Sequence, residues 1–403
     1  MDALVKMEHR SGFIDGEGDG CGILCDIPRT LWAQKLLASG KPGELAFDKR
    51  FAVGHIFIPR NLDRDAVMAD IRARMADAGF TVLHEEVDNV NPGVLGKNAR
   101  KESPTFWQVA LLAENVDTGR SLEAALFELH VAIEAAHNVH VASLSNHTVA
   151  YKVMGAAGIL PQYFADIGRP EFQSTVTIGH NRYSTNTLSN FFRVQPFTLL
   201  GHNGEINTIT RLEEEAEMLG VPLVAGGSDS QNLNRTAEAL IHRYNLTLFE
   251  AMEFLFPPIL NEIKQLRPEL QDLYAYIREA WGHFAQGPAG IVSRYKDECV
   301  FSVDAWACAR CGWWRTSAPC TSPRSRGSSR QRRWWPNPSP LPPAKRWASS
   351  CFRKAASAGT PTTSCRRRCG GAWRKRWTFA GSAIASSSDS PRRTWRYGSR
   401  SPR

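Results

Sequence analysis

The chain has 403 residues and a formal net charge of +9, but the positive charge is confined to its last quarter. Residues 306–403 hold 22 of the 49 Lys and Arg and one of the 40 Asp and Glu, so residues 1–305 are acidic and give no support for nucleic-acid binding. No run approaches the roughly 18 apolar residues of a membrane helix. Three scattered cysteines before residue 306 cannot form a disulfide framework, which favours a cytoplasmic protein.

Residues 1–305 alternate between strand-like and helix-like patterns. Runs of β-branched and aromatic residues predict strands at 51–58, 106–112, 148–154, 175–179 and 197–200. Amphipathic spacing predicts helices at 63–78, 121–136, 211–219 and 231–244, with Asp63 and Ser121 as N-caps of the first two. Strands that are not regularly followed by helices favour an α+β fold over a doubly wound sheet.

A polar motif follows the fourth expected strand. Residues 177–187 read TIGHNRYSTNT and place Arg182 at the strand end, with Thr185 in the same turn. The forked donors of a guanidinium match the two oxygens of a carboxylate. An arginine in an isolated His-x-Arg would more often form a surface ion pair. The prediction that Arg182 binds a carboxylate therefore depends on the complete motif at 177–187.

Two further motifs supply an oxyanion-type donor pair and a carboxylate. Residues 201–208 read GHNGEINT, in which the Asn203 amide precedes the backbone N–H of Gly204, a residue without Cβ. Residues 227–230 read GSDS and present Asp229. Alone, Asn-Gly is a tight turn and Ser-Asp-Ser is a helix N-cap. Together with Arg182, these groups suit a free amino acid and a tetrahedral intermediate.

The order and wording of these motifs, with GDGCGIL at 18–24 upstream, resemble the glutaminase domain of glutamate synthase, a class-II glutamine amidotransferase. The resemblance covers roughly residues 1–305. It implies the four-layer αββα sandwich of the N-terminal nucleophile hydrolases, and release of ammonia from glutamine for transfer to 2-oxoglutarate. It also implies the site roles: Arg182 binds the α-carboxylate, Thr185 lines the pocket, Asp229 binds the α-ammonium, Asn203 and Gly204 form the oxyanion hole. No metal site is expected.

The nucleophile of that family is an N-terminal cysteine, whereas this sequence starts Met1-Asp2. Cys21 stands where the family more often has a small residue such as alanine. An internal cysteine lacks the α-amine that activates the thiol, so Cys21 is not expected to replace it, and a pairing with His9 or His180 has no support. We expect the nucleophile strand to be missing, which leaves open a catalytically inactive fragment that retains a glutamine pocket.

Residues 306–403 differ abruptly from the rest, with nine of the twelve tryptophans among Arg, Ser and Pro. They are either a disordered basic arm that binds nucleic acid or a stretch translated out of frame. Back-translating 305–312 (AWACARCG) and shifting by one base gives Leu-Gly-Leu-Arg-Pro-Leu, which resembles the continuation of glutamate synthases. We therefore expect a frameshift at Ala305 and an unstructured tail. Its cysteine pairs do not suggest zinc, because the tail has no histidine.

The resemblance also bears on cofactors and partners. In complete glutamate synthases, downstream FMN and iron–sulfur domains use the released ammonia, so no cofactor is expected in this chain. The full-length protein is expected to work with a small reductase subunit or ferredoxin. The electron donor stays open between NADPH, NADH and ferredoxin, and the glutaminase half of another amidotransferase is the remaining alternative.

Overall fold

The computed structural model describes residues 1–8, 12–14, 16–116, 121–181, 190–258, 260–281, 285, 287, 289–303 and 347–349. Arg182, Thr185 and His9 lie outside the described residues, as does the tail apart from residues 347–349. Within these ranges every strand pairing is antiparallel and helices pack on the sheets, so the predicted α+β class is confirmed. No helix there has the length and apolarity that crossing a membrane requires.

The first sheet has four strands and two covering helices. In sheet order they are β5 (Phe80–Val87), β6 (Thr105–Ala113), β4 (Phe51–Ile58) and β7 (His140–Ser145), with α3 (Arg64–Asp77) and α5 (Leu122–Ala136) on the outer face. All eight residues of β4 are buried, because one face meets the helices and the other meets a second sheet. This explains why the strand reads as a nearly continuous apolar run rather than an alternating one.

The second sheet faces the inner side of the first. Its strands are, in order, β8 (Thr148–Val153), β3 (Cys21–Asp26) and β9 (Ile178–Asn181). Alternate β3 side chains, Cys21, Ile23 and Cys25, enter the core between the sheets, where they join Phe57 of β4 and Tyr151 of β8. This apolar layer holds the two sheets together.

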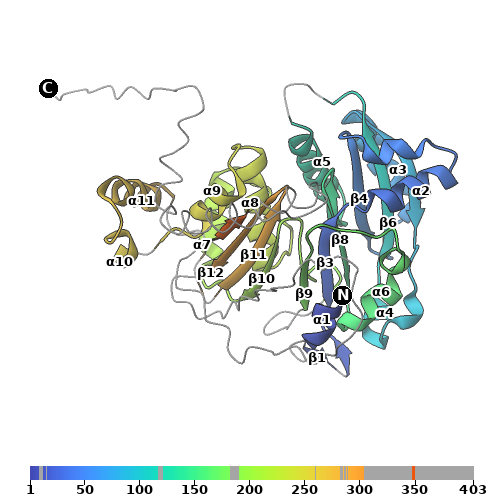
Figure 1. Cartoon of the computed structure of the whole chain (residues 1–403), viewed down its shortest axis with the longest axis horizontal. Helices are drawn as coiled ribbons and strands as arrows, with labels where there is room; N and C mark the ends of the chain where they lie inside the picture. Colours follow the sequence, from blue (N-terminus) through green and yellow to red (C-terminus); the bar gives the residue numbers. More distant parts are fainter. Residues whose placement is uncertain are drawn as a thin grey trace, which may run out of the picture.

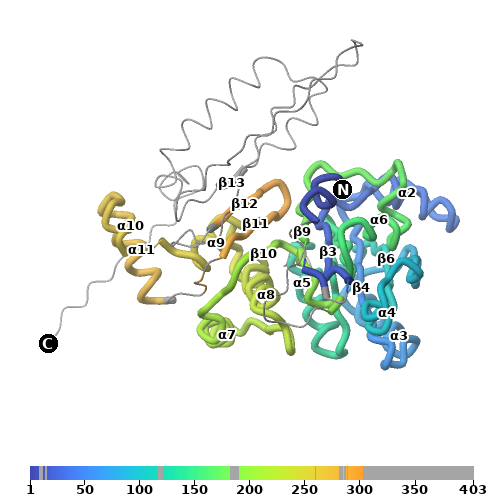
Figure 2. Tube along the Cα trace, turned by 90° about the horizontal axis from the view of Figure 1, so that it is seen from below, coloured from blue at the N-terminus to red at the C-terminus, as the bar shows by residue number. Residues whose placement is uncertain are grey.

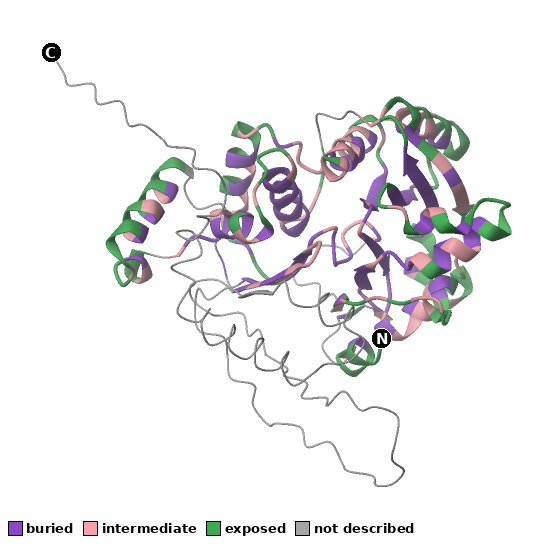
Figure 3. Cartoon of the chain, turned by 45° about the horizontal axis from the view of Figure 1, so that its top comes forward, coloured by how far each residue is buried: buried purple, intermediate pink, exposed green. Residues whose placement is uncertain are grey.

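A third set of strands lies beside β9 (Figures 1 and 2). It comprises β10 (Leu200–Gly204), β11 (Ala289–Tyr295), β12 (Glu298–Val303) and β13 (Trp347–Ser349), and it packs against α8 (Asp229–His242) and α9 (Leu248–Leu255). Leu200, Ile291 and Val300 are buried under these helices. The order of layers is thus helices, sheet, sheet, helices, as predicted. The second sheet layer consists of two separately hydrogen-bonded sheets, β8-β3-β9 and β10-β11-β12-β13. Figure 3 shows the helices turning buried sides inward.

The remaining elements surround these layers. They are α1 (Asp2–Lys6), β1 (Phe13–Ile14), β2 (Glu17–Gly18), α2 (Arg29–Ala38), α4 (Lys97–Glu102), α6 (Leu160–Tyr163), α7 (Ile209–Met218), α10 (Leu260–Ile263) and α11 (Pro268–Trp281). Helices α10 and α11 share a small apolar cluster of their own at the edge of the molecule (Figure 1). Residues 347–349 form β13 and pair with β12. The prediction of a wholly unstructured tail is therefore wrong for these three residues.

Helix ends match the sequence-based expectation closely, whereas two strand positions differ. Asp63 and Ser121 cap α3 and α5 through their side chains. The strand expected at 175–179 begins only at Ile178, because the Asp26 carboxylate accepts the Thr175 N–H at 2.6 Å and holds that residue outside the ladder. The strand expected at 197–200 begins at Leu200, because the Phe197 N–H bonds the Leu200 carbonyl at 2.9 Å in a turn.

One polar cluster is buried between the sheets. The Lys35 ammonium of α2 lies 2.8 Å from the Glu86 carboxylate and 2.9 Å from that of Asp166. Gln108 donates to Asp166 at 2.9 Å and lies 3.1 Å from His55 Nε2, whose Nδ1 bonds the Ala150 carbonyl at 2.9 Å. Each buried charge therefore has a partner of opposite sign or a hydrogen bond, as an apolar environment requires.

Candidate functional site

The predicted oxyanion residues lie at the end of β10. Asn203 pairs with Gly290 and Gly204 with Ala289 of β11, so Asn203-Gly204 ends a strand and is not the tight turn of a hairpin. Gly204 has φ +114°, a backbone conformation that residues with a Cβ rarely adopt. Both residues are exposed. Their donors can therefore face a ligand at the open end of the sheet.

Asp229 is the first residue of α8. Ser228 caps this 14-residue helix, and Gln231 completes a capping box by accepting the Ser228 N–H at 3.0 Å. The Ser-Asp-Ser segment is thus the helix N-cap that the sequence allowed. The Asp229 carboxylate is half-buried and its Oδ1 accepts from the Ser230 N–H at 2.6 Å. A carboxylate is favoured here by the partial positive charge of the helix N-terminus.

Strand β10 and helix α8 meet through a histidine. His202 Nδ1 lies 2.7 Å from Ser230 Oγ, and the His202 ring is buried. This bond brings the residue before Asn203 into contact with the residue after Asp229. The oxyanion donors and the carboxylate, 26 residues apart in sequence, therefore occupy one region of the fold.

The segment that precedes Arg182 reaches the same region. Strand β9 ends at Asn181, and His180 Nε2 donates to the His202 carbonyl at 2.9 Å. Arg182 and Thr185 themselves lie outside the described residues, so their predicted roles stay predictions. The expectation that Arg182 follows directly on a strand agrees with where β9 ends.

Cys21 has the surroundings of an inert core thiol. It is fully buried on β3, and its Sγ lies 3.4 Å from the Ala156 carbonyl. Burial, with a smaller effect of the Glu8 charge, raises the pKa of the thiol to about 12. Thiolate is the nucleophilic form, so Cys21 is not activated. Cys25 and Cys299 are also buried, and burial raises the pKa of both thiols.

A buried cluster of polar side chains around Lys152 supports the segment next to α8. The Lys152 ammonium, fully buried, lies 2.6 Å from His140 Nε2 and donates to the Phe192 carbonyl at 3.0 Å. Burial, assisted by the Lys152 charge, lowers the pKa of His140 to about 4, so its neutral ring can accept from Lys152. Gln231 donates to the same Phe192 carbonyl at 3.2 Å. No local sequence pattern points to this cluster, because its members come from β7, β8, α8 and the segment between β9 and β10.

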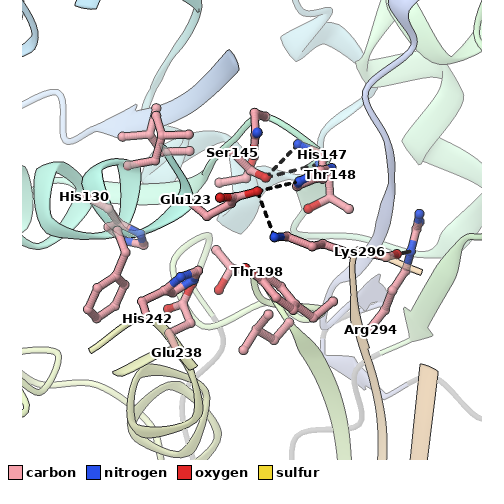
Figure 4. A pocket seen from close by; sticks show the side chains of 17 residues that line it. Glu123, His130, Ser145, His147, Thr148, Thr198, Glu238, His242, Arg294 and Lys296 are labelled. Carbon is pink, nitrogen blue, oxygen red and sulfur yellow. Dashed lines mark hydrogen bonds and ion pairs between the residues drawn. The ribbon is translucent and has the colours of Figure 1, made fainter. Parts of the chain in front are cut away.

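A partly open cavity lies between α5, the β7–β8 turn, α8 and β11 (Figure 4). Glu123 closes one side, bonded to His147 Nε2 at 3.0 Å and to the Lys296 ammonium at 2.9 Å. These bonds, His147 first, lower the pKa of Glu123. A volume of about 40 Å³ accommodates a few water molecules. The cavity is too small for glutamine and lies away from the end of β10.

The described side chains show no metal site. No group of three or more His, Cys, Asp and Glu side chains in these ranges has the arrangement to hold a metal ion. An open groove of about 570 Å³ lies beside Gly226 and Gly227, but α7 lines it with Glu213, Glu214 and Glu217. Carboxylates on one wall do not suit the carboxylate of an amino acid. The chemistry available at the described site is therefore that of hydrogen-bond donors and one carboxylate.

The chain is similar to known proteins, both in a family model and in individual relatives. The family model of class-II glutamine amidotransferases matches residues 1–302. Ferredoxin-dependent glutamate synthase 2 of Synechocystis is 31% identical over 319 residues, covering 72% of this chain and 20% of that protein. Ferredoxin-dependent glutamate synthase 1 of Arabidopsis thaliana is 32% identical over 362 residues, covering 78% and 21%. The chain thus spans about a fifth of the length of these relatives.

A solved structure of the B. subtilis glutamine phosphoribosylpyrophosphate amidotransferase, complexed with ADP and GMP, is also similar. It is 13% identical, with a TM-score of 0.27, and covers 72% of this chain and 38% of its own. At this level of likeness the structure adds nothing to the assignment of individual residues.

Proposed function

Because the chain belongs to the class-II glutamine amidotransferases, we propose that residues 1–305 are the glutaminase region of a glutamate synthase. Such a region releases ammonia from glutamine, and the larger protein transfers it to 2-oxoglutarate. The observation that carries the proposal is the meeting of β10 and α8 through His202 and Ser230 at 2.7 Å. That contact brings together the donor pair and the carboxylate that a glutamine site needs.

Each site residue has a role set by its chemistry. Asp229 attracts the α-ammonium of glutamine, and Arg182 binds the α-carboxylate, with Thr185 lining the pocket. When a thiolate attacks the side-chain amide, negative charge develops on its oxygen. The Asn203 amide and the Gly204 N–H stabilise that oxygen, and removal of one such donor costs about 2.7–4 kcal/mol of transition-state stabilisation in a well-studied hydrolase.

The rest of the reaction belongs to the larger protein. We propose that FMN and an iron–sulfur cluster are held by parts that follow this region, and that no cofactor binds within residues 1–305. Electrons would come from ferredoxin or a reductase subunit, in the cytoplasm. The relatives from Synechocystis and Arabidopsis support ferredoxin, because both are named ferredoxin-dependent, whereas the relative from Azospirillum brasilense is named for NADPH.

A second candidate is a glutamine-binding region without hydrolysis. The burial of all three described cysteines favours it, because none of them offers a reactive thiolate. Isothermal titration of the 403-residue chain with L-glutamine, combined with an ammonia assay, separates the two. The glutaminase predicts saturable binding with ammonia release above a buffer blank, and the second candidate predicts binding without ammonia. In both cases binding should be abolished by Arg182→Ala and preserved by the exposed Arg64→Ala control. Ammonia release would remove the second candidate, and absence of binding would remove both.

We also propose that residues 306–403 are translated out of frame. The family match ends at residue 302, three residues before the suspected frameshift. Sequencing the gene across codons 303–313 tests this proposal. One added or missing base that restores Leu-Gly-Leu-Arg-Pro-Leu is the expected result, and an unaltered reading frame would refute it.

A further inference from the structure

His202 occupies an unusually constrained position on β10. Its backbone N–H donates to Gln195 Oε1 at 2.6 Å, and its carbonyl accepts from His180 Nε2 at 2.9 Å. The ring lies on the face of β10 that meets α8, where Nδ1 is 2.7 Å from Ser230 Oγ. Only 3% of the residue is exposed. Backbone and side chain are therefore both fixed.

The hydrogen bonds of Ser230 determine which ring nitrogen carries the proton. The Asp229 carboxylate can only accept, and Ser230 Oγ lies 3.1 Å from its Oδ1, so the single hydroxyl proton of Ser230 is directed to Asp229. The serine oxygen must then accept from His202 Nδ1–H. Burial lowers the pKa of His202 and outweighs the opposing effect of the Asp229 charge, so the ring is neutral at pH 7. Nε2 is then unprotonated, and it is buried without a hydrogen-bond partner among the described residues.

This chain of donors fixes one oxygen of the carboxylate. Asp229 Oδ1 accepts from both the N–H and the hydroxyl of Ser230, at 2.6 and 3.1 Å. Within the described ranges no side chain bonds Oδ2. Among the described residues, the carboxylate is held by one oxygen, which leaves the other oxygen for a ligand.

We propose that His202 is a positioning residue, which acts through Ser230 to orient the Asp229 carboxylate toward the α-ammonium of glutamine. The inference deepens the proposed function and rests on it, because it takes Asp229 as the ammonium-binding group. It adds the donor that sets the carboxylate in place before the ligand arrives. Such a donor lowers the cost of ordering the carboxylate on binding.

Two ligands separate positioning from general structural support. L-Glutamine carries the α-ammonium, and glutaramate is the same molecule without the amino group. Titration of the full chain measures the dissociation constant of each. We expect Ser230→Ala and His202→Phe to weaken L-glutamine binding about 10-fold, as loss of about 1.4 kcal/mol implies, and to leave glutaramate binding unchanged. His202→Asn, which can keep a donor near the Nδ1 position, should restore most of the affinity.

Equal weakening of both ligands would mean that His202 only supports the fold, and unchanged glutamine binding in Ser230→Ala would also overturn the inference. His84→Phe on β5, at the other sheet, is the matched control. The variant Asp229→Asn distinguishes a failure of the positioning role of His202 from a failure of the proposed ammonium-binding role of Asp229. If it leaves L-glutamine binding unchanged, the ammonium role is wrong, and the inference falls with it.

A spectroscopic test does not depend on ligand binding. ¹⁵N NMR of the histidine-labelled chain at pH 7 should show His202 protonated at Nδ1 and unprotonated at Nε2, and this pattern should be lost in Ser230→Ala. A ring protonated at Nε2 would overturn the inference.

Discussion

Replacing Lys35 with methionine tests how the two sheets are held together. The ammonium is 5% exposed and lies 2.8 and 2.9 Å from Glu86 and Asp166. Methionine fills most of the volume of the side chain but removes the charge, which leaves the Asp166 carboxylate, 4% exposed, without a counterion. Breaking a buried ion pair on one side costs about 3–5 kcal/mol. A domain is stable by about 5–15 kcal/mol, so this loss is a large fraction of the total.

The loss should depend on pH. Burial alone would raise the pKa of Asp166, but the Lys35 charge holds it below its usual range in the native protein. A carboxyl with a lowered pKa stabilises the fold above its unfolded pKa, and this contribution disappears as pH falls through the folded value. Without Lys35, burial dominates and the pKa rises, so Asp166 destabilises the fold until it is protonated. The difference between the native protein and Lys35→Met should therefore be largest near pH 7 and shrink toward pH 4.

Urea unfolding followed by circular dichroism at pH 7 and pH 4 measures both effects. The matched control is Lys41→Met, because Lys41 is exposed and has no such partners. A further variant, Lys35→Met with Asp166→Asn, should recover part of the stability by removing the unpaired charge. The reasoning is refuted if Lys35→Met unfolds within 1 kcal/mol of Lys41→Met at pH 7, an interval of the order expected for a surface substitution.

Three further predictions concern a helix cap, two histidines and the buried thiols. Ser228→Ala should lower the free energy of unfolding by about 1 kcal/mol, because α8 loses its capping box; an unchanged urea midpoint would contradict this. Burial lowers the pKa of His55 and His140 to about 4, so the unfolded chain binds more protons between pH 6.5 and 4. Stability should fall by about 3 kcal/mol per histidine as pH drops through that interval, and a flat stability curve would exclude neutral buried rings. Cys21, Cys25 and Cys299 should resist alkylation at pH 8 in the native chain and react in urea, as peptide mass mapping would report.

The elements with a strong repeating pattern could be predicted from the sequence. Helix α3 carries an Asp63 cap at one end and Gly79, at φ +84°, beyond the other, and both signals are local. Strand β10 could not be placed, because its limits depend on distant groups. Asn234 Oδ1 accepts the Leu199 N–H at 3.0 Å, so this N–H bonds a side chain of α8 rather than the neighbouring strand.

The candidate site was predictable only in part, and for a similar reason. Asn203, Gly204 and Asp229 stand in compact motifs whose residue types already suggest their chemistry, and the fold gathers them. His202 and Ser230 stand in the same motifs, but their hydrogen bond joins residues 28 apart, and no spacing rule connects a strand to a helix over that length. Lys152 reads as an ordinary strand residue, and only the fold shows it to be fully buried.

The junction between β9 and β10 is made by side chains rather than by a backbone ladder, within the residues described. His180 and Gln195 satisfy the carbonyl and N–H of His202 that a neighbouring strand would otherwise pair. Shifting one strand along its neighbour inside a sheet breaks all the backbone hydrogen bonds between them at once. Between β9 and β10, the spacing of the two strands is instead set by the side chains of His180 and Gln195, which substitution can replace. Substitutions at positions 180 and 195 can therefore change the spacing between β9 and β10 during evolution, one hydrogen bond at a time, while both sheets keep their registers.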